Sequence, residues 1–189
     1  MGIDTMNGRR AVFLDRDGVL NRALCDGGSS FPPPDAESME IMPGAGESVA
    51  ALRAAGYLCI CVTNQPDIAR GTRTMENVAS MNEKVTGVLD LDDLYLCPHD
   101  NADGCDCRKP KPGMLLAAIA KWGIDPDASW MVGDRLTDVE AGRAAGCRTI
   151  LICETSPPPG PDHVSRDLPE AVEYIMRAGK TRAAEPGGR

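Results

Sequence analysis

Aromatic residues are scarce in this chain: Phe, Trp and Tyr make up 4% of its 189 residues. Apolar residues still account for 42%, so we expect a core built mainly from Val, Leu, Ile, Ala and Met. Long hydrophobic runs are also lacking and residues 1–10 are polar, so neither a membrane span nor a secretory signal is predicted, and we expect a cytoplasmic protein. A single domain over residues 1–178 and a disordered tail over 179–189 are predicted.

Basic residues are fewer than acidic ones. The chain has 20 Lys and Arg residues and 28 Asp and Glu residues, which gives a net charge of -8 at pH 7. A negative surface repels nucleic acid and anionic membranes, so neither is expected as a partner. A phosphorylated small-molecule substrate would therefore need a local cation or a group of N–H donors in order to bind. A monomer is expected.

Short apolar runs alternate with amphipathic segments along the chain. Strands are predicted at residues 11–14, 57–62, 94–96, 130–132 and 149–152, and helices at 44–55, 75–89, 112–121, 136–145 and 168–178. This alternation predicts an α/β fold with a doubly wound, Rossmann-like parallel sheet. Ligands bind such sheets beyond the carboxyl ends of the strands, which is where Asp15, Thr63 and Asp134 follow apolar runs.

The first of these polar sites is the sequence Asp15-Arg16-Asp17-Gly18. Two carboxylates directly after a buried strand can bind Mg²⁺, and one of them can attack phosphorus while the other transfers protons. The alternative is a solvated turn, in which Asp and Gly are common.

Three later segments offer complementary chemistry. Thr63 could hold phosphoryl oxygens or merely cap a turn, and Lys109 could neutralise a phosphoryl group or belong to a solvated basic patch. Asp134 is a candidate metal ligand, and Asp138 either supports the ligands or faces solvent. Each segment is a weak signal alone, but the four in this order are specific.

Together these segments resemble the haloacid dehalogenase (HAD) superfamily of phosphatases. The four motifs are FLDRDGVLN, VTNQ, RKPKPG and VGDRLTD, and the resemblance extends from about Val12 to Ile152. It implies that Asp15 is the nucleophile and an Mg²⁺ ligand, and that Asp17 is the general acid and base and binds Mg²⁺ through its carbonyl. It also implies that Thr63 and Lys109 stabilise the transferred phosphoryl group and that Asp134 is a further Mg²⁺ ligand. The intervals 20–44 and 63–109 are too short for a large cap domain, so the chain resembles the capless subfamily IIIA.

A cluster of metal-binding residues precedes the third motif. Cys97, His99, Cys105 and Cys107 offer three thiolates and one imidazole, a set that tetrahedral zinc takes in closed, structural sites. The alternative is a set of reduced surface cysteines. A zinc-bound loop over residues 97–107 would fix the following Arg108 and Lys109 over the phosphate site. Cys59 and Cys61, in contrast, are expected in the core, and no role is assigned to His163.

Within the superfamily, the zinc loop is similar to those of the heptose bisphosphate phosphatases and of the histidinol-phosphate phosphatases. IARG at 68–71 and PGML at 112–115 favour the former, whereas the short interval between His99 and Cys105 is closer to the latter. Pro66-Asp67 stands where the heptose enzymes have Ser-Gly, and the 21–34 loop lacks their His-Gly-Tyr stretch. The expected substrate-binding residues are Asn64, Gln65, Arg108 and Arg135. A heptose bisphosphate is the predicted substrate, histidinol phosphate the alternative, and a non-catalytic zinc-stabilised binding module the alternative from another class.

Overall fold

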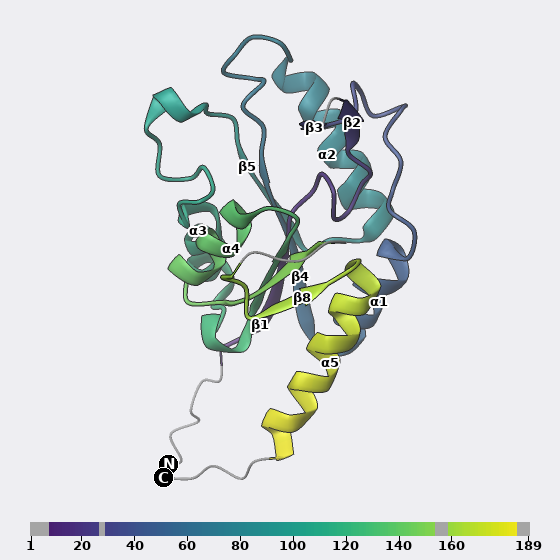
Figure 1. Cartoon of the computed structure of the whole chain (residues 1–189), viewed down its shortest axis with the longest axis vertical. Helices are drawn as coiled ribbons and strands as arrows, with labels where there is room; N and C mark the ends of the chain where they lie inside the picture. The colour runs from purple at the N-terminus through teal and green to yellow at the C-terminus, as the bar shows by residue number, and fades with distance from the viewer. Residues whose placement is uncertain (1–7, 27–28, 154–158, 185–189) are drawn as a thin grey trace.

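A computed structural model describes residues 8–26, 29–153 and 159–184, and it contains a central six-stranded sheet (Figure 1). Every neighbouring pair of strands in this sheet is parallel. In spatial order the strands are β5 (Asp93–Cys97), β4 (Tyr57–Asn64), β1 (Arg10–Leu14), β6 (Trp130–Gly133), β7 (Arg148–Ile152) and β8 (His163–Ser165). The predicted doubly wound α/β fold is therefore confirmed.

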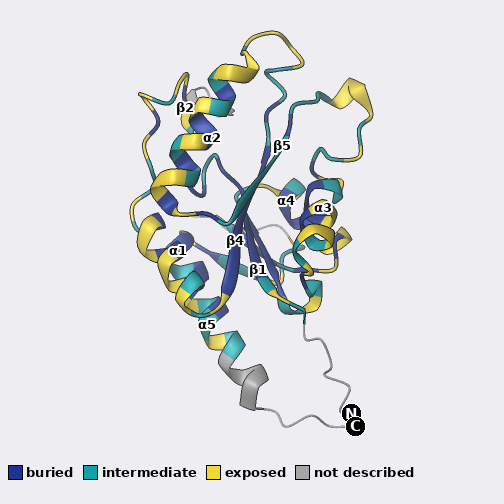
Figure 2. Cartoon of the chain, turned by 180° about the vertical axis from the view of Figure 1, so that it is seen from behind, coloured by how far each residue is buried: buried dark blue, intermediate teal, exposed yellow. Residues whose placement is uncertain are grey.

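Helices cover both faces of this sheet (Figures 1 and 2). One face carries α1 (Ala45–Ala54), α2 (Met75–Leu89) and α5 (Leu168–Ala184), and the other carries α3 (Gly113–Trp122) and α4 (Leu136–Ala144). Two short 3₁₀ helices, η1 (Asn101–Asp103) and η2 (Pro126–Ala128), lie in connecting loops.

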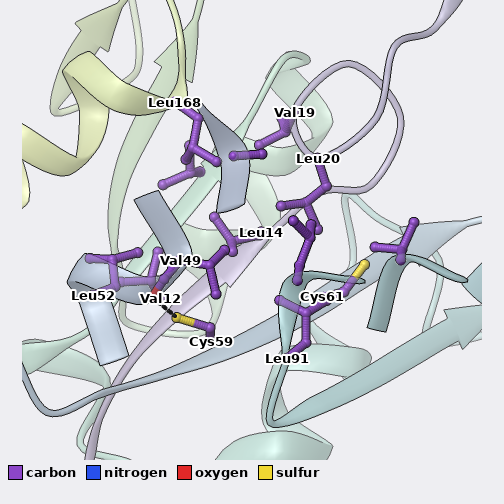
Figure 3. Close-up of a cluster of buried hydrophobic side chains, with 14 of the residues drawn as sticks. Val12, Leu14, Val19, Leu20, Val49, Leu52, Cys59, Cys61, Leu91 and Leu168 are labelled. Carbon is purple, nitrogen blue, oxygen red and sulfur yellow. Dashed lines mark hydrogen bonds between the residues drawn. The ribbon is translucent and has the colours of Figure 1, made fainter. Parts of the chain in front are cut away.

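The alternation of side chains along each strand divides the core into two clusters, one on each face. In β4, Cys59 and Cys61 belong to the cluster under α1, α2 and α5, whereas Ile60 and Val62 belong to the cluster under α3 and α4. Figure 3 shows Cys59 and Cys61 in the first cluster with Val12 and other aliphatic side chains. Both cysteines are fully buried, which confirms their predicted place in the core.

The strand order places three loops at one edge of the sheet. The chain runs from β1 outward through β4 to β5 and then returns to β6 on the other side of β1. Leu14 at the end of β1 pairs with Cys61 of β4 and with Val132 of β6, so Asp15 emerges beside the ends of both neighbours. This is the switch point at which doubly wound sheets bind ligands.

Two segments predicted as loops contain strands. The segment predicted as a loop over 21–34 contains a hairpin of β2 (Leu24–Asp26) and β3 (Ser29–Phe31), whose residues 27–28 lie outside the described part. His163, predicted in a loop, begins strand β8. Both elements are only three residues long, and neither shows the apolar alternation from which strands are recognised. Among the described residues no cap domain is inserted in the intervals 20–44 and 63–109, which the sequence analysis found too short for a large one.

The C-terminal helix is also longer than predicted. It continues past Gly179, where the tail was predicted to begin, to Ala184, while residues 185–189 lie outside the described part. The division into one domain and a tail stays a prediction, as do residues 1–7 of that domain, which are not described. Within the described ranges no helix is long and apolar enough to cross a membrane.

Candidate active site

A cavity of about 580 Å³ opens at the carboxyl edge of the sheet. It collects residues from all four predicted motifs, from the β2–β3 hairpin and from the loop that contains η1. The residues at its wall that were predicted as site residues are Asp15, Asp17, Thr63, Asn64, Gln65, Arg108, Lys109 and Arg135, and Asp138 also lines it.

Lys109 lies at the floor of this cavity with 3% of its surface exposed. Its Nζ is 2.6 Å from Asp15 Oδ1 and 2.7 Å from Asp138 Oδ1, and it donates to the carbonyl oxygen of Val62 at 2.7 Å. These three acceptors match the three donors of an ammonium group. The lysine is therefore fixed in position and orientation by β1, β4 and α4.

Burial and neighbouring charges set the protonation of this group. Burial lowers the pKa of Lys109, but the attraction of Asp138 and Asp15 outweighs it, so the pKa is raised above its ordinary value. Burial raises the pKa of Asp15 to about 7, against the opposing attraction of Lys109 and with further repulsion from Asp138 and Asp134. Lys109 therefore remains positively charged. Its attraction does not fully offset the effect of burial on the pKa of Asp15.

Asp134 follows β6 and faces the loop of the first motif. A Cβ atom at Gly18, whose φ is +96°, would collide with Asp134 Oδ2, so glycine allows the two loops to approach. Burial raises the pKa of Asp134 to about 6, and repulsion from Asp138 adds to this shift. Its Oδ1 is buried and has no hydrogen-bond partner among the described residues.

The three carboxylates fit a divalent cation. Oxygen atoms of Asp15, Asp134 and Asp138 all lie within 4.8 Å of one another, and Lys109 is shared by two of them. The unpartnered oxygen of Asp134 and the raised pKa values show that negative charge is incompletely compensated here. Hard oxygen ligands at this spacing are the ligands that Mg²⁺ takes.

Asp17 is held by a set of donors beside this group. Its Oδ2 accepts from Arg16 Nη2 at 2.9 Å and from Gln65 Nε2 at 2.8 Å, and its Oδ1 accepts from Asn21 Nδ2 at 3.0 Å. Gln65 Nε2 also lies 2.9 Å from Thr63 Oγ1. The Gln65 amide, predicted to bind substrate, thus connects two predicted catalytic residues.

Asn64 has a comparable role toward Lys109. Its Oδ1 accepts from the Lys109 N–H at 3.1 Å, and its Nδ2 donates to the Lys109 carbonyl at 3.0 Å. The main chain of the lysine is thereby attached to the end of β4. The prediction of Asn64 as a substrate contact stays a prediction, and Asn64 does line the cavity. Its contact with Lys109 was not predicted, because a tertiary contact between residues 64 and 109 leaves no local signal in the sequence.

The two arginines at the cavity are attached to different elements. Arg108 donates from Nε to Asn101 Oδ1 at 2.7 Å and from Nη1 to the His99 carbonyl at 3.2 Å, so the 97–107 loop holds Arg108. The same loop was expected to fix Lys109 as well, but Asn64 at the end of β4 holds the main chain of the lysine. Arg135 is the N-cap residue of α4, and its N–H donates to Asp138 Oδ2 at 3.1 Å. Both arginines line the cavity.

The four predicted zinc ligands come together beyond the end of β5. Cys107 Sγ lies 3.2 Å from Cys97 Sγ, 3.5 Å from Cys105 Sγ and 3.3 Å from His99 Nδ1. Tetrahedral zinc with bonds of about 2.3 Å would place thiolate sulfurs roughly 3.8 Å apart, so the cluster has the size of a zinc site. Burial opposes ionisation of Cys105, but hydrogen bonds from the Arg108 N–H and from Cys107 lower its pKa to about 7, as suits a metal ligand.

Comparison with known proteins identifies the family. Residues 106–171 match a family model described as HAD-hydrolase-like. The D-glycero-β-D-manno-heptose-1,7-bisphosphate 7-phosphatase of Pasteurella multocida is 36% identical over 181 residues, covering 90% of this chain and 92% of the relative. The chain belongs to this family of HAD phosphatases. The Vibrio cholerae member of the family is 41% identical over 160 residues, covering 78% of this chain and 83% of the relative.

Solved structures agree with this assignment. The D,D-heptose 1,7-bisphosphate phosphatase from B. bronchiseptica, complexed with magnesium and phosphate, superposes with a TM-score of 0.76 and 28% identity, over 89% of this chain and 99% of that one. A HAD-like phosphatase from Mesorhizobium loti gives a TM-score of 0.74 at 28% identity, over 96% of this chain and 90% of that one. The chain is thus an enzyme of the phosphatase class, which excludes the non-catalytic binding module.

Proposed function

We propose that this enzyme removes the 7-phosphate of D-glycero-D-manno-heptose 1,7-bisphosphate. The observation that carries the proposal is the buried contact between Lys109 Nζ and Asp15 Oδ1, at the floor of a cavity bordered by two arginines. The lysine fixes one carboxylate oxygen and adds positive charge where a phosphoryl group would lie. The family relationship supplies the heptose bisphosphate as the substrate.

The reaction proceeds in two displacements. The Asp15 carboxylate attacks phosphorus, the bond from phosphorus to the sugar oxygen breaks, and Asp17 gives that oxygen its proton. Asp17 then takes a proton from water, whose oxygen attacks the phosphoaspartate and releases inorganic phosphate and free Asp15. The donors on Asp17 from Gln65 and Arg16 hold its carboxylate in place between the two steps.

Asp15, Asp134 and the carbonyl of Asp17 would hold Mg²⁺, and Asp138, the third carboxylate of the cluster, would support the site through Lys109. When bound, the ion would neutralise charge on the nucleophile and the phosphoryl oxygens. The Thr63 hydroxyl and the Lys109 ammonium stabilise the phosphoryl group during transfer.

The remaining predicted residues divide into supports and substrate contacts. Asn64 and Gln65 act through Lys109 and Asp17, to which their amides are bonded. Arg108 and Arg135 bind the part of the substrate that bears the second phosphate, because an Arg fork pairs with phosphate oxygens. The four clustered residues would hold zinc, which would stabilise the loop that holds Arg108. We also propose that the enzyme is a cytoplasmic monomer that binds neither nucleic acid nor membranes.

A substrate panel tests this function. The specificity constant kcat/KM is measured with Mg²⁺ for the α and β anomers of the heptose bisphosphate, for histidinol phosphate and for acetyl phosphate. We expect a heptose bisphosphate to rank first by at least about tenfold, because a second phosphate adds charge-assisted contacts. A higher value for histidinol phosphate, toward which the short interval between His99 and Cys105 points, would overturn the substrate but not the chemistry.

A further inference from the structure

Arg73 connects two segments that border the substrate cavity. It lies in the loop between β4 and α2, and only 15% of its side chain is exposed. Its guanidinium donates to the carbonyls of Pro32, Pro33 and Pro34, while its Nε lies 3.4 Å from Asp67 Oδ2. Pro32 and Asp67 both line the cavity. One largely buried cation thus joins the end of the β2–β3 hairpin to the loop that follows β4.

The hairpin needs such an attachment. Strands β2 and β3 have three residues each and pair only with one another among the described strands, and an isolated two-stranded hairpin is at best marginally stable. The three prolines after Phe31 have no N–H groups and cannot continue a strand ladder. Their carbonyls still need donors, and the planar fork of a guanidinium supplies several at fixed angles.

The attached end of the hairpin places an apolar side chain at the cavity. Phe31 lines the cavity although 50% of its surface is exposed, and it pairs across the hairpin with Leu24, which is 48% exposed. Two exposed apolar residues on a hairpin of this length do not hold it against the core. The position of the Phe31 ring therefore depends on what fixes Pro32.

Asp67 extends this connection to the zinc loop. Its Oδ1 lies 3.6 Å from Arg70 Nη1, and Arg70 in turn makes two 2.8 Å contacts with the carboxylate of Asp100, which follows the zinc ligand His99. Asp67 thus lies between two arginines and opposes the repulsion between them. A continuous network of charged groups runs from the hairpin to the zinc loop along the mouth of the cavity.

We propose that Arg73 is a positioning residue that holds Phe31 and Pro32 as a wall of the substrate cavity, and that Asp67 orients Arg73. This inference rests on the proposed function, since it assigns the wall to the leaving group of that reaction. Arg73 contacts the prolines, Asp67 and the sulfur of Met81. Its effect is on how the sugar is held, and the phosphoryl transfer at Asp15 is left unchanged.

The variant Arg73→Met removes the donors and keeps much of the length of the side chain. We expect kcat/KM for the best substrate of the panel to fall about tenfold, through a higher KM, because the lost interaction is with the part of the substrate that does not react. Acetyl phosphate, which is too small to reach the wall, should be hydrolysed within about twofold of the wild-type rate. Arg73→Lys, which retains the charge, should recover part of the loss.

Lys84→Met is the matched control. Lys84 also donates from α2 to two carbonyls of the same connecting segment, those of Ala36 and Met39, which are not among the residues lining the cavity. We expect this variant to lower the melting temperature. The ratio of kcat/KM for the best substrate of the panel to kcat/KM for acetyl phosphate should stay unchanged. An equal change of that ratio in both variants would overturn the proposal.

A double-mutant cycle with Phe31→Ala tests whether Arg73 affects kcat/KM through the position of Phe31. If Arg73 acts through Phe31, Arg73→Met should change kcat/KM by less than about twofold in the Phe31→Ala background. Additive effects, or an equal loss on acetyl phosphate, would contradict the proposal. If Arg73→Met does not fold, Asp67→Asn replaces it in the cycle and should shift the ratio in the same direction. The cycle uses whichever substrate ranks first, so a wrong assignment of the sugar is detected separately by the panel.

Discussion

Lys109 and Asp138 form an ion pair in which both side chains are only 2% exposed, with 2.7 Å between Nζ and Oδ1. Asp138 is in the first turn of α4 and also accepts from the Arg135 N–H at 3.1 Å. The same ammonium reaches Asp15 at 2.6 Å. Because the lysine is shared, the charge on Asp138 sets how strongly Lys109 interacts with Asp15.

Asp138→Asn should therefore lower kcat by about 10- to 100-fold, a typical effect of losing a buried partner that orients a catalytic group. The amide keeps the size of the side chain and removes its charge, so Lys109 is drawn closer to Asp15 and interacts less with the phosphoryl group. Steady-state kinetics measures the effect. Glu170→Gln, which removes one charge of the exposed pair with Arg166, is the control and should leave kcat unchanged. Wild-type turnover in Asp138→Asn would contradict this role.

Asp15→Asn should abolish turnover, by at least about 1,000-fold in kcat, because an amide does not attack phosphorus. The fold should persist, since burial already disfavours the charge at this position and Lys109 retains Asp138 and the Val62 carbonyl as partners. Turnover and thermal unfolding are measured on the same preparation. Substantial remaining activity in a folded sample would exclude Asp15 as the nucleophile.

Gly18→Ala should impair both stability and activity. A side chain at φ +96° costs roughly 1–2 kcal/mol, and its Cβ would also displace the Asp134 carboxylate. Gly123→Ala is the matched control, because its φ is +62° and no atom lies within 4 Å of the added Cβ. We expect both variants to melt earlier and only Gly18→Ala to require more Mg²⁺ for half-maximal activity. An equal Mg²⁺ requirement in the two would argue against Asp134 as a ligand.

The zinc cluster predicts about one zinc ion per chain in protein purified without chelators, measured by elemental analysis. Cys105→Ser should lose the metal and melt earlier, and should raise KM more than it lowers kcat, because the loop holds Arg108 through His99 and Asn101. Cys153→Ser, outside the cluster, should keep both metal and KM. Finding no zinc in the wild-type protein would refute the structural zinc site.

Much of the fold follows from local patterns. Asp15, Thr63 and Asp134 lie at the carboxyl ends of β1, β4 and β6, on one edge of the sheet, as the rule for parallel sheets predicts. Helix α2 has the predicted bounds, because Thr74 caps its first turn by accepting from the Asn77 N–H and the apolar period is regular. Metal-ligand spacing likewise indicated the zinc cluster, whose four members do converge.

What local patterns missed depends on contacts between distant segments. Asn64 bonds to Lys109 and Arg73 to Pro33 across 45 and 40 positions, and no motif encodes either contact. The sequence is equally compatible with a supporting and with a solvent-exposed position for Asp138, whereas in the structure its side chain is buried against Lys109. The sequence did not predict the hairpin because its strands have three residues each, and the bond from Arg73 to the Pro32 carbonyl beside it joins segments 41 positions apart.

The two bonds from the Asn64 amide to the Lys109 peptide imitate the pairing of one further strand residue at the end of β4. The sheet, rather than the metal loop, thus sets the register of the lysine. We therefore expect insertions or deletions between His99 and Cys105 to move Arg108, and the substrate contact proposed for it, while the lysine keeps its place. Such an arrangement would let substrate choice change while the position of the lysine, and with it the chemical step, stays the same.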